Sequence, residues 1–154
     1  MKYADHLWIM ENAHEEAKLA FNKGEVPVGA IITDSLGREV SKAHNTKEKN
    51  LDATAHAEIL ALKLAAKKLG SWRLNNLNLY VTLEPCPMCL SAISQFRISK
   101  IFFGAYDTKG GALSLGYNMH SDSRLNHQFD VMGGLDQYRN SNLLSDFFKL
   151  RRGN

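Results

Sequence analysis

Cysteine is scarce in this chain of 154 residues, which contains only Cys86 and Cys89. Two thiols cannot form the network of disulfides that stabilises many small secreted domains. A pair separated by two residues is instead typical of a metal-binding or redox site. Because such thiols must stay reduced, we expect the protein to be cytoplasmic.

Long hydrophobic runs are also absent. The N-terminus opens into a charged, amphipathic stretch without an apolar segment behind it, so we expect no signal peptide. No apolar stretch approaches the roughly 20 residues of a membrane-spanning helix, so we expect no membrane association. The formal net charge is only +3, which selects no class of partner. With 44% hydrophobic residues the chain can bury a core, and its length predicts one domain over residues 1–154.

The periodicity of the apolar residues predicts alternating helices and strands. The expected elements are a helix over 3–22, strands over 26–32 and 38–43, a helix capped by Thr54 and running to Leu69, a strand over 77–83, a helix over 87–96, a strand over 98–105 and a helix over 143–152, with loops over 45–52 and 110–119. Strand–helix–strand units imply parallel pairing, and the first two strands form an antiparallel hairpin. We therefore predict a three-layer α/β/α fold around a central mixed sheet.

Two short motifs carry the chemistry. His56-Ala57-Glu58 supplies an imidazole and a carboxylate, and Pro85-Cys86-Pro87-Met88-Cys89 supplies two thiols. Structural zinc sites have four protein ligands, whereas catalytic zinc sites have three and leave a position open for water. We therefore predict one zinc ion per chain, bound by His56, Cys86 and Cys89, with Glu58 as the catalytic proton carrier.

The expected elements place both motifs at the starts of helices. Cys86 should cap one helix with Cys89 one turn on, and His56 should lie just inside the start of the other. Two helix N-termini would then point at one ion. Their positive ends would offset the charge of the thiolates and lower the pKa of each thiol.

Each motif alone is a weak signal. A lone Cys-x-x-Cys near a strand–helix unit also fits a thioredoxin-like redox pair, and a lone His-x-Glu occurs by chance on helix surfaces. The combination of His-x-Glu with Pro-Cys-x-x-Cys is much more specific, and it matches the signature of zinc nucleobase deaminases.

Beyond these motifs the chain resembles the bacterial tRNA-specific adenosine deaminase family, within the cytidine deaminase superfold. The likeness covers nearly the whole chain. It has its core in residues 52–59 and 80–89, and it includes Glu25 to Ala30, Arg97-Ile98, Phe103-Gly104-Ala105, Asp107-Thr108-Lys109, Leu125-Asn126-His127 and residues 144–148. The resemblance implies hydrolytic deamination of adenosine to inosine at the wobble position of a tRNA anticodon. It also implies a homodimer whose partner chain helps to complete each RNA site.

The resemblance further assigns substrate contacts. Asn45 is expected to hydrogen-bond the purine. Val28 and Leu83 are expected to form the apolar walls against the flipped base. The remaining expected contacts are Ala57 beside the base, Asp107 and Lys109 for neighbouring nucleotides, and Phe148, Lys149, Arg151 and Arg152 on the last helix for the anticodon loop. On the residues alone, Asn45 also fits a turn, Val28 and Leu83 fit a core, and the basic C-terminus fits a solvated helix end. One of Phe147 and Phe148 is expected to pack while the other faces the RNA.

Two other functions are compatible with the zinc motifs. A deaminase of a free base or nucleoside, of the guanine or cytosine type, uses the same zinc chemistry but needs a lid over a small pocket. A non-catalytic zinc module explains neither the missing fourth ligand nor Glu58. The cations Lys149, Arg151 and Arg152 beside an aromatic pair favour RNA, because phosphates require positive charge at an open mouth.

Overall fold

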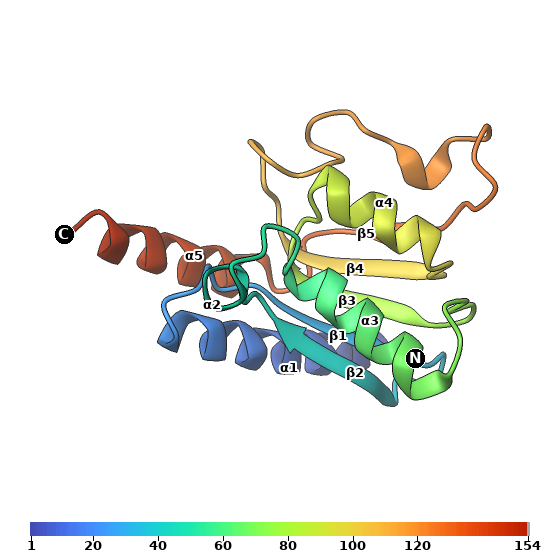
Figure 1. Cartoon of the computed structure of the whole chain (residues 1–154), viewed down its shortest axis with the longest axis horizontal. Helices are drawn as coiled ribbons and strands as arrows, with labels where there is room; N and C mark the ends of the chain where they lie inside the picture. Colours follow the sequence, from blue (N-terminus) through green and yellow to red (C-terminus); the bar gives the residue numbers. More distant parts are fainter. Residues whose placement is uncertain (154) are drawn as a thin grey trace.

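The computed structural model describes residues 1–153 and contains a five-stranded sheet covered by helices (Figure 1). In chain order the elements are α1 (Tyr3–Asn22), β1 (Gly29–Thr33), β2 (Glu39–His44), α2 (Lys47–Asn50), α3 (Ala57–Leu69), β3 (Asn78–Leu83), α4 (Pro87–Gln95), β4 (Lys100–Ala105), the 3-10 turn η1 (Met119–Ser121), β5 (Asp130–Met132) and α5 (Gln137–Arg151). Within the described residues, no helix is both long enough and apolar enough to cross a membrane.

The sheet is mixed, as predicted, with the strand order β2-β1-β3-β4-β5. Strand β1 pairs antiparallel with both β2 and β3, while β4 is parallel to β3 and β5 is parallel to β4. Strands β2 and β3 therefore run in the same direction on either side of β1, and α3 connects them. Because β3 and β4 are parallel, their carboxyl ends meet at one edge of the sheet, where the segments leading to α4 and away from β4 begin.

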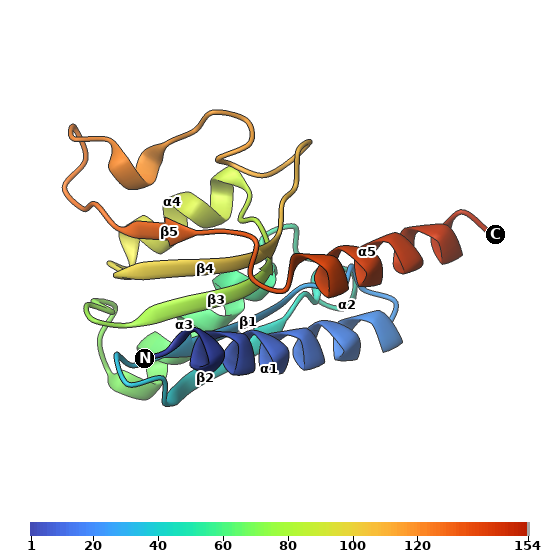
Figure 2. The same ribbon diagram turned by 180° about the vertical axis from the view of Figure 1, so that it is seen from behind.

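Helices cover both faces of the sheet, which confirms the three-layer prediction. Helices α3 and α4 lie on one face, and α1 and α5 lie on the other (Figures 1 and 2). Alternate strand residues point to opposite faces. The α3/α4 face buries Ala30, Ile32, Leu79, Val81, Ile101 and Phe103, and the α1 face buries Ile31, Tyr80 and Phe102.

Helix α1 approaches β1 most closely at Gly29. A Cβ atom at this position would overlap the backbone of Ala13 and Ala17. The N–H of Gly29 donates to the hydroxyl of Thr82 on the neighbouring strand at 3.1 Å. Glycine is therefore required here because a helix backbone packs directly on a strand backbone.

The expected helix boundaries differ from the structure in the segment before the zinc motif. Thr54 does not cap α3, because its N–H and hydroxyl both donate to the carboxylate of Asp52 at 2.8 and 2.7 Å. Helix α3 begins at Ala57, and His56 is its cap residue with extended backbone, not a residue inside the first turn. The expected loop over residues 45–52 contains the short helix α2, which tertiary contacts stabilise.

Two further differences lie towards the C-terminus. Strand β5 was not expected, since its three residues are exposed or half-buried and show no apolar alternation. Helix α5 begins at Gln137, earlier than the expected start at Leu143. Its first turns are polar, and the buried Asn140 there has its Oδ1 2.7 Å from Nδ1 of His14 on α1.

Candidate active site

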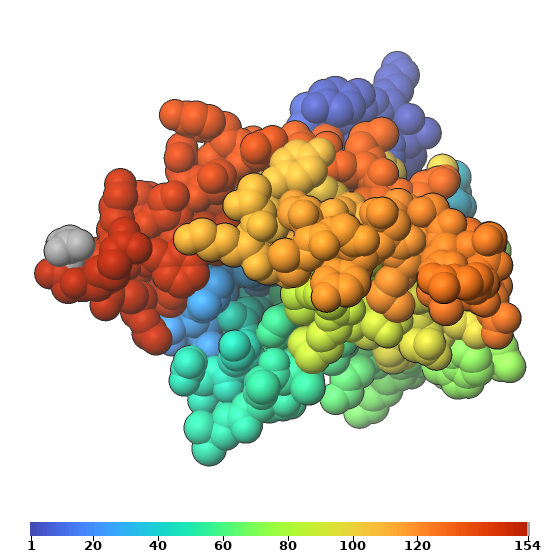
Figure 3. Space-filling view, turned by 90° about the horizontal axis from the view of Figure 1, so that it is seen from above, coloured from blue at the N-terminus to red at the C-terminus, as the bar shows by residue number. Residues whose placement is uncertain are grey.

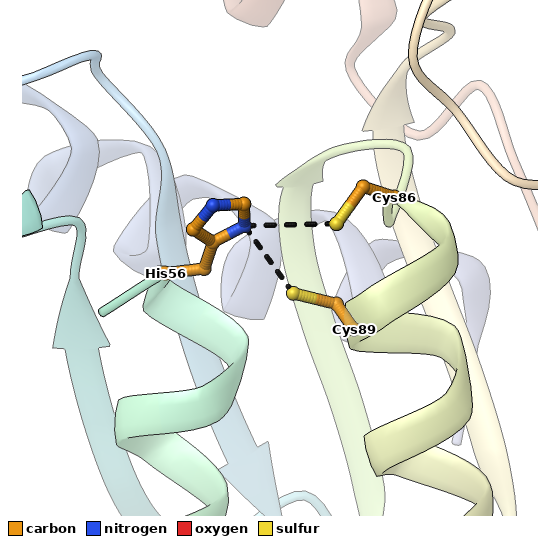
Figure 4. A group of neighbouring side chains, drawn as sticks. All are labelled: His56, Cys86 and Cys89. Carbon is orange, nitrogen blue, oxygen red and sulfur yellow. Dashed lines mark hydrogen bonds between the residues drawn. The ribbon is translucent and has the colours of Figure 1, made fainter. Parts of the chain in front are cut away.

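The three predicted metal ligands converge at the starts of two helices, as Figure 4 shows. His56 caps α3 and Cys86 caps α4, and both have extended backbone conformations. Pro87 occupies the first turn of α4, where its missing N–H costs no hydrogen bond. Cys89 lies one turn further along α4, so its sulfur shares the face of Cys86. The expectation of two helix N-termini facing one point is confirmed.

The distances within this group fit a zinc ion. Nδ1 of His56 lies 3.7 Å from the sulfur of Cys86 and 3.4 Å from that of Cys89. Zinc–sulfur bonds of about 2.3 Å and zinc–nitrogen bonds of about 2.0–2.1 Å at a tetrahedral angle would separate the sulfur and nitrogen atoms by about 3.6 Å. All three ligand atoms lie within 4.8 Å of one another. The residues present therefore fit zinc with Nδ1 of His56 as the ligand nitrogen.

The two ligand thiols differ strongly in acidity. A hydrogen bond from Cys89 lowers the pKa of Cys86 to about 4, and the hydrogen bond with Cys86 raises the pKa of Cys89. One sulfur is therefore a ready thiolate and the other holds the proton. A dication bound to both sulfurs would take the place of the proton on Cys89. Metal binding is therefore expected to release that proton.

Glu58 lies in the first turn of α3 and is 4% exposed. Burial raises the pKa of Glu58 to about 7. The carboxylate is thus close to the ligand group and has a proton affinity suited to exchange near neutral pH. It is not needed to complete the ligand set formed by His56 and the two cysteines.

A cavity of about 160 Å³ opens beside the ligands. It brings together the ligand residues His56 and Cys86, the carrier Glu58, and the expected substrate residues Val28, Asn45, Ala57, Leu83 and Asp107. Sequence reasoning missed three further lining residues, Val26, Lys47 and Glu84. Val26 lies inside the expected strand over 26–32, and Glu84 lies inside the core of the resemblance over 80–89, but neither was expected to line the site. Lys47 gave no signal because it lies in a polar stretch without a motif.

Two backbone contacts orient the side chain of Asn45. Its Nδ2 donates to the carbonyl of Val26 at 3.2 Å, and its Oδ1 accepts from the N–H of Lys47 at 3.1 Å. A carboxamide has two N–H donors and two oxygen lone pairs. One donor and one lone pair therefore remain for a ligand, and the side chain is held in a fixed orientation before any ligand binds.

A larger chamber of about 600 Å³ adjoins the cavity and shares Val26, Leu83 and Asp107 with it. Its other walls include Tyr106, Lys109, Phe148, Lys149 and Arg152. In the space-filling view of Figure 3, the red α5 and the teal segment around α2 lie at the same end of the molecule. The chamber thus combines cations with an exposed aromatic ring.

The residues of the C-terminal segment that were expected to contact RNA do not all line the chamber. Phe148 is 44% exposed in the chamber, whereas Phe147 is buried against Phe21, which confirms that one ring packs and the other is available. Arg151 does not line the chamber. Its guanidinium donates to the carbonyl of Gly24 at 3.3 Å and lies over the ring of Phe147.

Comparisons with known proteins agree with this geometry. The sequence profile of the cytidine and deoxycytidylate deaminase zinc-binding region matches residues 4–105. A tRNA-specific adenosine deaminase of Bacillus subtilis (strain 168) is 44% identical over 145 residues, covering 94% of this chain and 89% of that protein. One of Aquifex aeolicus (strain VF5) is 46% identical over 148 residues, covering 96% of each. A solved structure from studies of A-to-I editing by tRNA:A34 deaminases has a TM-score of 0.83 at 41% identity, covering 88% of this chain and 97% of the other.

Proposed function

The chain belongs to the cytidine and deoxycytidylate deaminase family of zinc-binding proteins. We propose that it deaminates adenosine to inosine at the wobble position of a tRNA anticodon. The observation that carries the proposal is a three-ligand metal group with a buried carboxylate beside it, opening into a cationic chamber. The likeness to tRNA-specific adenosine deaminases over nearly the whole chain supports this substrate.

The reaction consumes water and adenosine and releases ammonia. His56, Cys86 and Cys89 would hold a zinc ion, and zinc when bound would lower the pKa of a water molecule towards about 7, so that water can attack carbon 6 of the purine. Glu58 is placed to take one proton of the attacking water and deliver it to N1 of the ring, which keeps that proton in inosine. It then carries the second proton, from the new hydroxyl at carbon 6, to the amino group, which leaves as ammonia. Burial supports this role, because it raises the pKa of Glu58 to about 7, where the carboxyl both accepts and returns protons.

The base is held by residues that already have fixed positions. We propose that Asn45 hydrogen-bonds the purine with the N–H and lone pair that its backbone contacts leave free. Val28 and Leu83 exclude water from its faces, and Ala57 leaves room beside them. Because the side chain of Asn45 is oriented in advance, little conformational entropy is lost when the base enters.

The chamber favours RNA over a free base. A strand that enters the cavity with one nucleotide must continue through the adjoining space, where Lys109, Lys149 and Arg152 can meet phosphates and Phe148 can stack on a base. An enzyme for free guanine or cytosine would instead need this side closed. An anticodon loop also suits the cavity, because its bases are already partly unstacked.

We also propose that two chains associate as a homodimer in the cytoplasm. Large apolar side chains are exposed in the segments that lead to or contain site residues, including Leu51 at 91%, Leu115 at 47% and Met88 between the ligand cysteines. Burying them against a second copy would remove apolar surface from water. The two thiols that bind the metal support a reducing compartment. Light scattering coupled to gel filtration would measure the mass in solution.

One experiment separates the candidate functions. The zinc-loaded protein is incubated with an anticodon stem-loop containing adenosine at the wobble position, and in parallel with free adenosine, guanine and cytosine. Nucleoside mass spectrometry measures inosine, and an enzymatic assay measures ammonia. We expect inosine in the stem-loop. Ammonia from guanine or cytosine without inosine in the RNA would replace this proposal with a free-base deaminase.

A further inference from the structure

We infer that Glu84 is a positioning residue that fixes the loop over residues 107–114, and thereby controls how the enzyme holds the nucleotides beside its target base. The inference rests on the proposed function. Glu84 follows β3 and precedes the Pro85-Cys86 segment, and it is 2% exposed. A buried carboxylate needs hydrogen-bond partners, so where its partners come from indicates what it supports.

Both carboxylate oxygens of Glu84 accept hydrogen bonds from this loop. Oε1 accepts from the backbone N–H of Asp107 at 3.1 Å and from the hydroxyl of Ser114 at 2.6 Å, and Oε2 accepts from the N–H of Ser114 at 2.8 Å. The ion pairs within residues 1–153 do not include Glu84. Loop donors, and not a cation, therefore satisfy its charge, and displacing the loop would leave a buried carboxylate without partners.

The loop also packs around the carboxylate. A Cβ atom on Gly111 would overlap the side chain of Glu84, so only glycine allows this approach. The N–H of Ala112 donates to the carbonyl of Pro85 at 2.8 Å, and that of Gly111 to the carbonyl of Asp107 at 2.8 Å. The loop is thus fastened to the same segment that carries the ligand Cys86.

This loop forms a wall of the chamber. Asp107 lines both the cavity and the chamber, and Thr108 and Lys109 line the chamber. The carboxylate of Asp107 accepts the N–H of Lys109 at 3.2 Å and that of Gly110 at 3.0 Å, so the backbone of Lys109 follows Asp107. By anchoring Asp107, Glu84 holds the surface that faces the neighbouring nucleotides. Its carboxylate is occupied by the loop and takes no part in the proton transfers assigned to Glu58.

A thermodynamic cycle between the protein and the RNA tests this role. Fluorescence anisotropy measures the affinity of zinc-loaded protein for an intact anticodon stem-loop and for stem-loops with an abasic nucleotide on either side of the target adenosine. For the wild type, each missing base should weaken binding. In Glu84→Gln an amide N–H₂ faces the N–H of Ser114, which loosens the loop. The intact stem-loop should then bind about tenfold more weakly. The abasic penalty, which is the loss of affinity caused by removing one neighbouring base, should largely disappear.

Two further variants separate positioning from general damage. Glu25→Gln is the matched control, because Glu25 is also 2% exposed and its carboxylate accepts the N–H groups of Glu48 and Lys49 on α2, both at 2.9 Å. It should retain the abasic penalty. Ser114→Ala removes one donor to Glu84 and should reduce the penalty in part. Zinc content should be unchanged in all variants.

The outcomes are distinct. If Glu84→Gln weakens the binding of every stem-loop equally and keeps the abasic penalty, the inference is wrong. If Glu84→Gln does not fold, an unchanged penalty in Ser114→Ala overturns it instead. If the wild type neither binds the stem-loop nor forms inosine in it, the proposed function fails, and this inference fails with it.

Discussion

At the scale of single residues, the burial of Glu58 links its protonation to the chemistry of the site. Its pKa of about 7 allows the carboxylate to accept a proton at neutral pH. Glu58→Gln keeps the size of the side chain and removes this capacity. We expect the variant to retain its zinc while single-turnover inosine formation slows by about 10²–10⁴-fold.

The matched comparison is Cys89→Ala, which removes a ligand and leaves Glu58 in place. Because metal binding is coupled to folding, this variant should lose zinc and unfold at a lower temperature. Elemental analysis of both variants checks the division of roles. Full zinc content in Cys89→Ala, or loss of zinc in Glu58→Gln, would contradict it.

His6 gives a pH dependence that is independent of the metal group. Its Nδ1 lies 2.7 Å from the hydroxyl of Tyr80, and its ring stacks on Phe102 at 4.5 Å. Burial lowers the pKa of His6 below its usual 6.5, and burial raises the pKa of Tyr80 to about 12, so the Tyr80 hydroxyl donates to a neutral imidazole.

Between the lowered pKa and 6.5, the unfolded chain binds more protons at His6 than the native protein does. The contribution of His6 to stability is therefore present above pH 6.5 and falls as the pH drops through that window. His6→Gln, which can still accept from Tyr80, should lose less stability than the wild type between pH 7.5 and 5.5. Urea unfolding at both pH values measures the difference, and equal losses would rule out this assignment.

The ligand group was predictable from the sequence, while much of its surroundings was not. His56, Cys86 and Cys89 lie in short motifs at helix starts, so local structure alone brings them to helix ends. The roles of Lys47 and Glu84 depend on where loops fold back, which no local pattern encodes. Arg151 was expected to face the RNA, but its hydrogen bond to Gly24 comes from the packing of α5 beside α1.

At the scale of elements, the contact between α1 and β1 depends on Gly29. Gly29→Ala places a methyl group against the backbone of Ala13 and Ala17, and neither backbone can move alone. We expect a loss of about 1–3 kcal/mol or more in the free energy of unfolding, measured by urea denaturation. Gly24→Ala is a useful contrast, because space is open there and only the backbone angle of +75° is unfavourable. An equal or smaller loss for Gly29→Ala would show that the layers can separate.

The elements themselves were predictable where packing follows a repeating pattern. Strands β1, β3 and β4 are buried runs, and α1 and α3 have apolar faces, so their existence followed from periodicity. Strand β5 has no such pattern and is defined by pairing with β4. The segment of α2 was expected to be a loop. Its backbone N–H groups donate to the carboxylate of Glu25, which lies more than 20 residues away in the sequence. In these cases tertiary contacts override local propensity.

At the scale of the whole molecule, the three cations at the C-terminal end of α5 divide into two that face the chamber and one that does not. Lys149 and Arg152 line the chamber, whereas Arg151 contacts Gly24 and Phe147. Replacing Lys149 and Arg152 with Gln should weaken stem-loop binding. It should also reduce the slope of log affinity against log salt by about 2, because each lost phosphate contact reduces that slope by about 1. Arg151→Gln, which removes the same charge, should change the slope less. Equal slopes in all three proteins would mean that the basic helix end is only solvated.

The whole molecule carries no sulfhydryl outside its metal-binding group, so alkylation becomes a gauge of metal occupancy. In the folded metal-free chain, iodoacetamide should add one group, at the half-buried thiolate of Cys86, because Cys89 is buried and keeps its proton. It should add none to a chain whose sulfurs are both coordinated, and intact mass spectrometry resolves the two forms in one sample. The same scarcity makes the enzyme vulnerable to oxidants, because thiolates are the reactive form of cysteine. With no spare thiol to intercept peroxide, oxidative damage to cysteine in this protein falls on the catalytic centre.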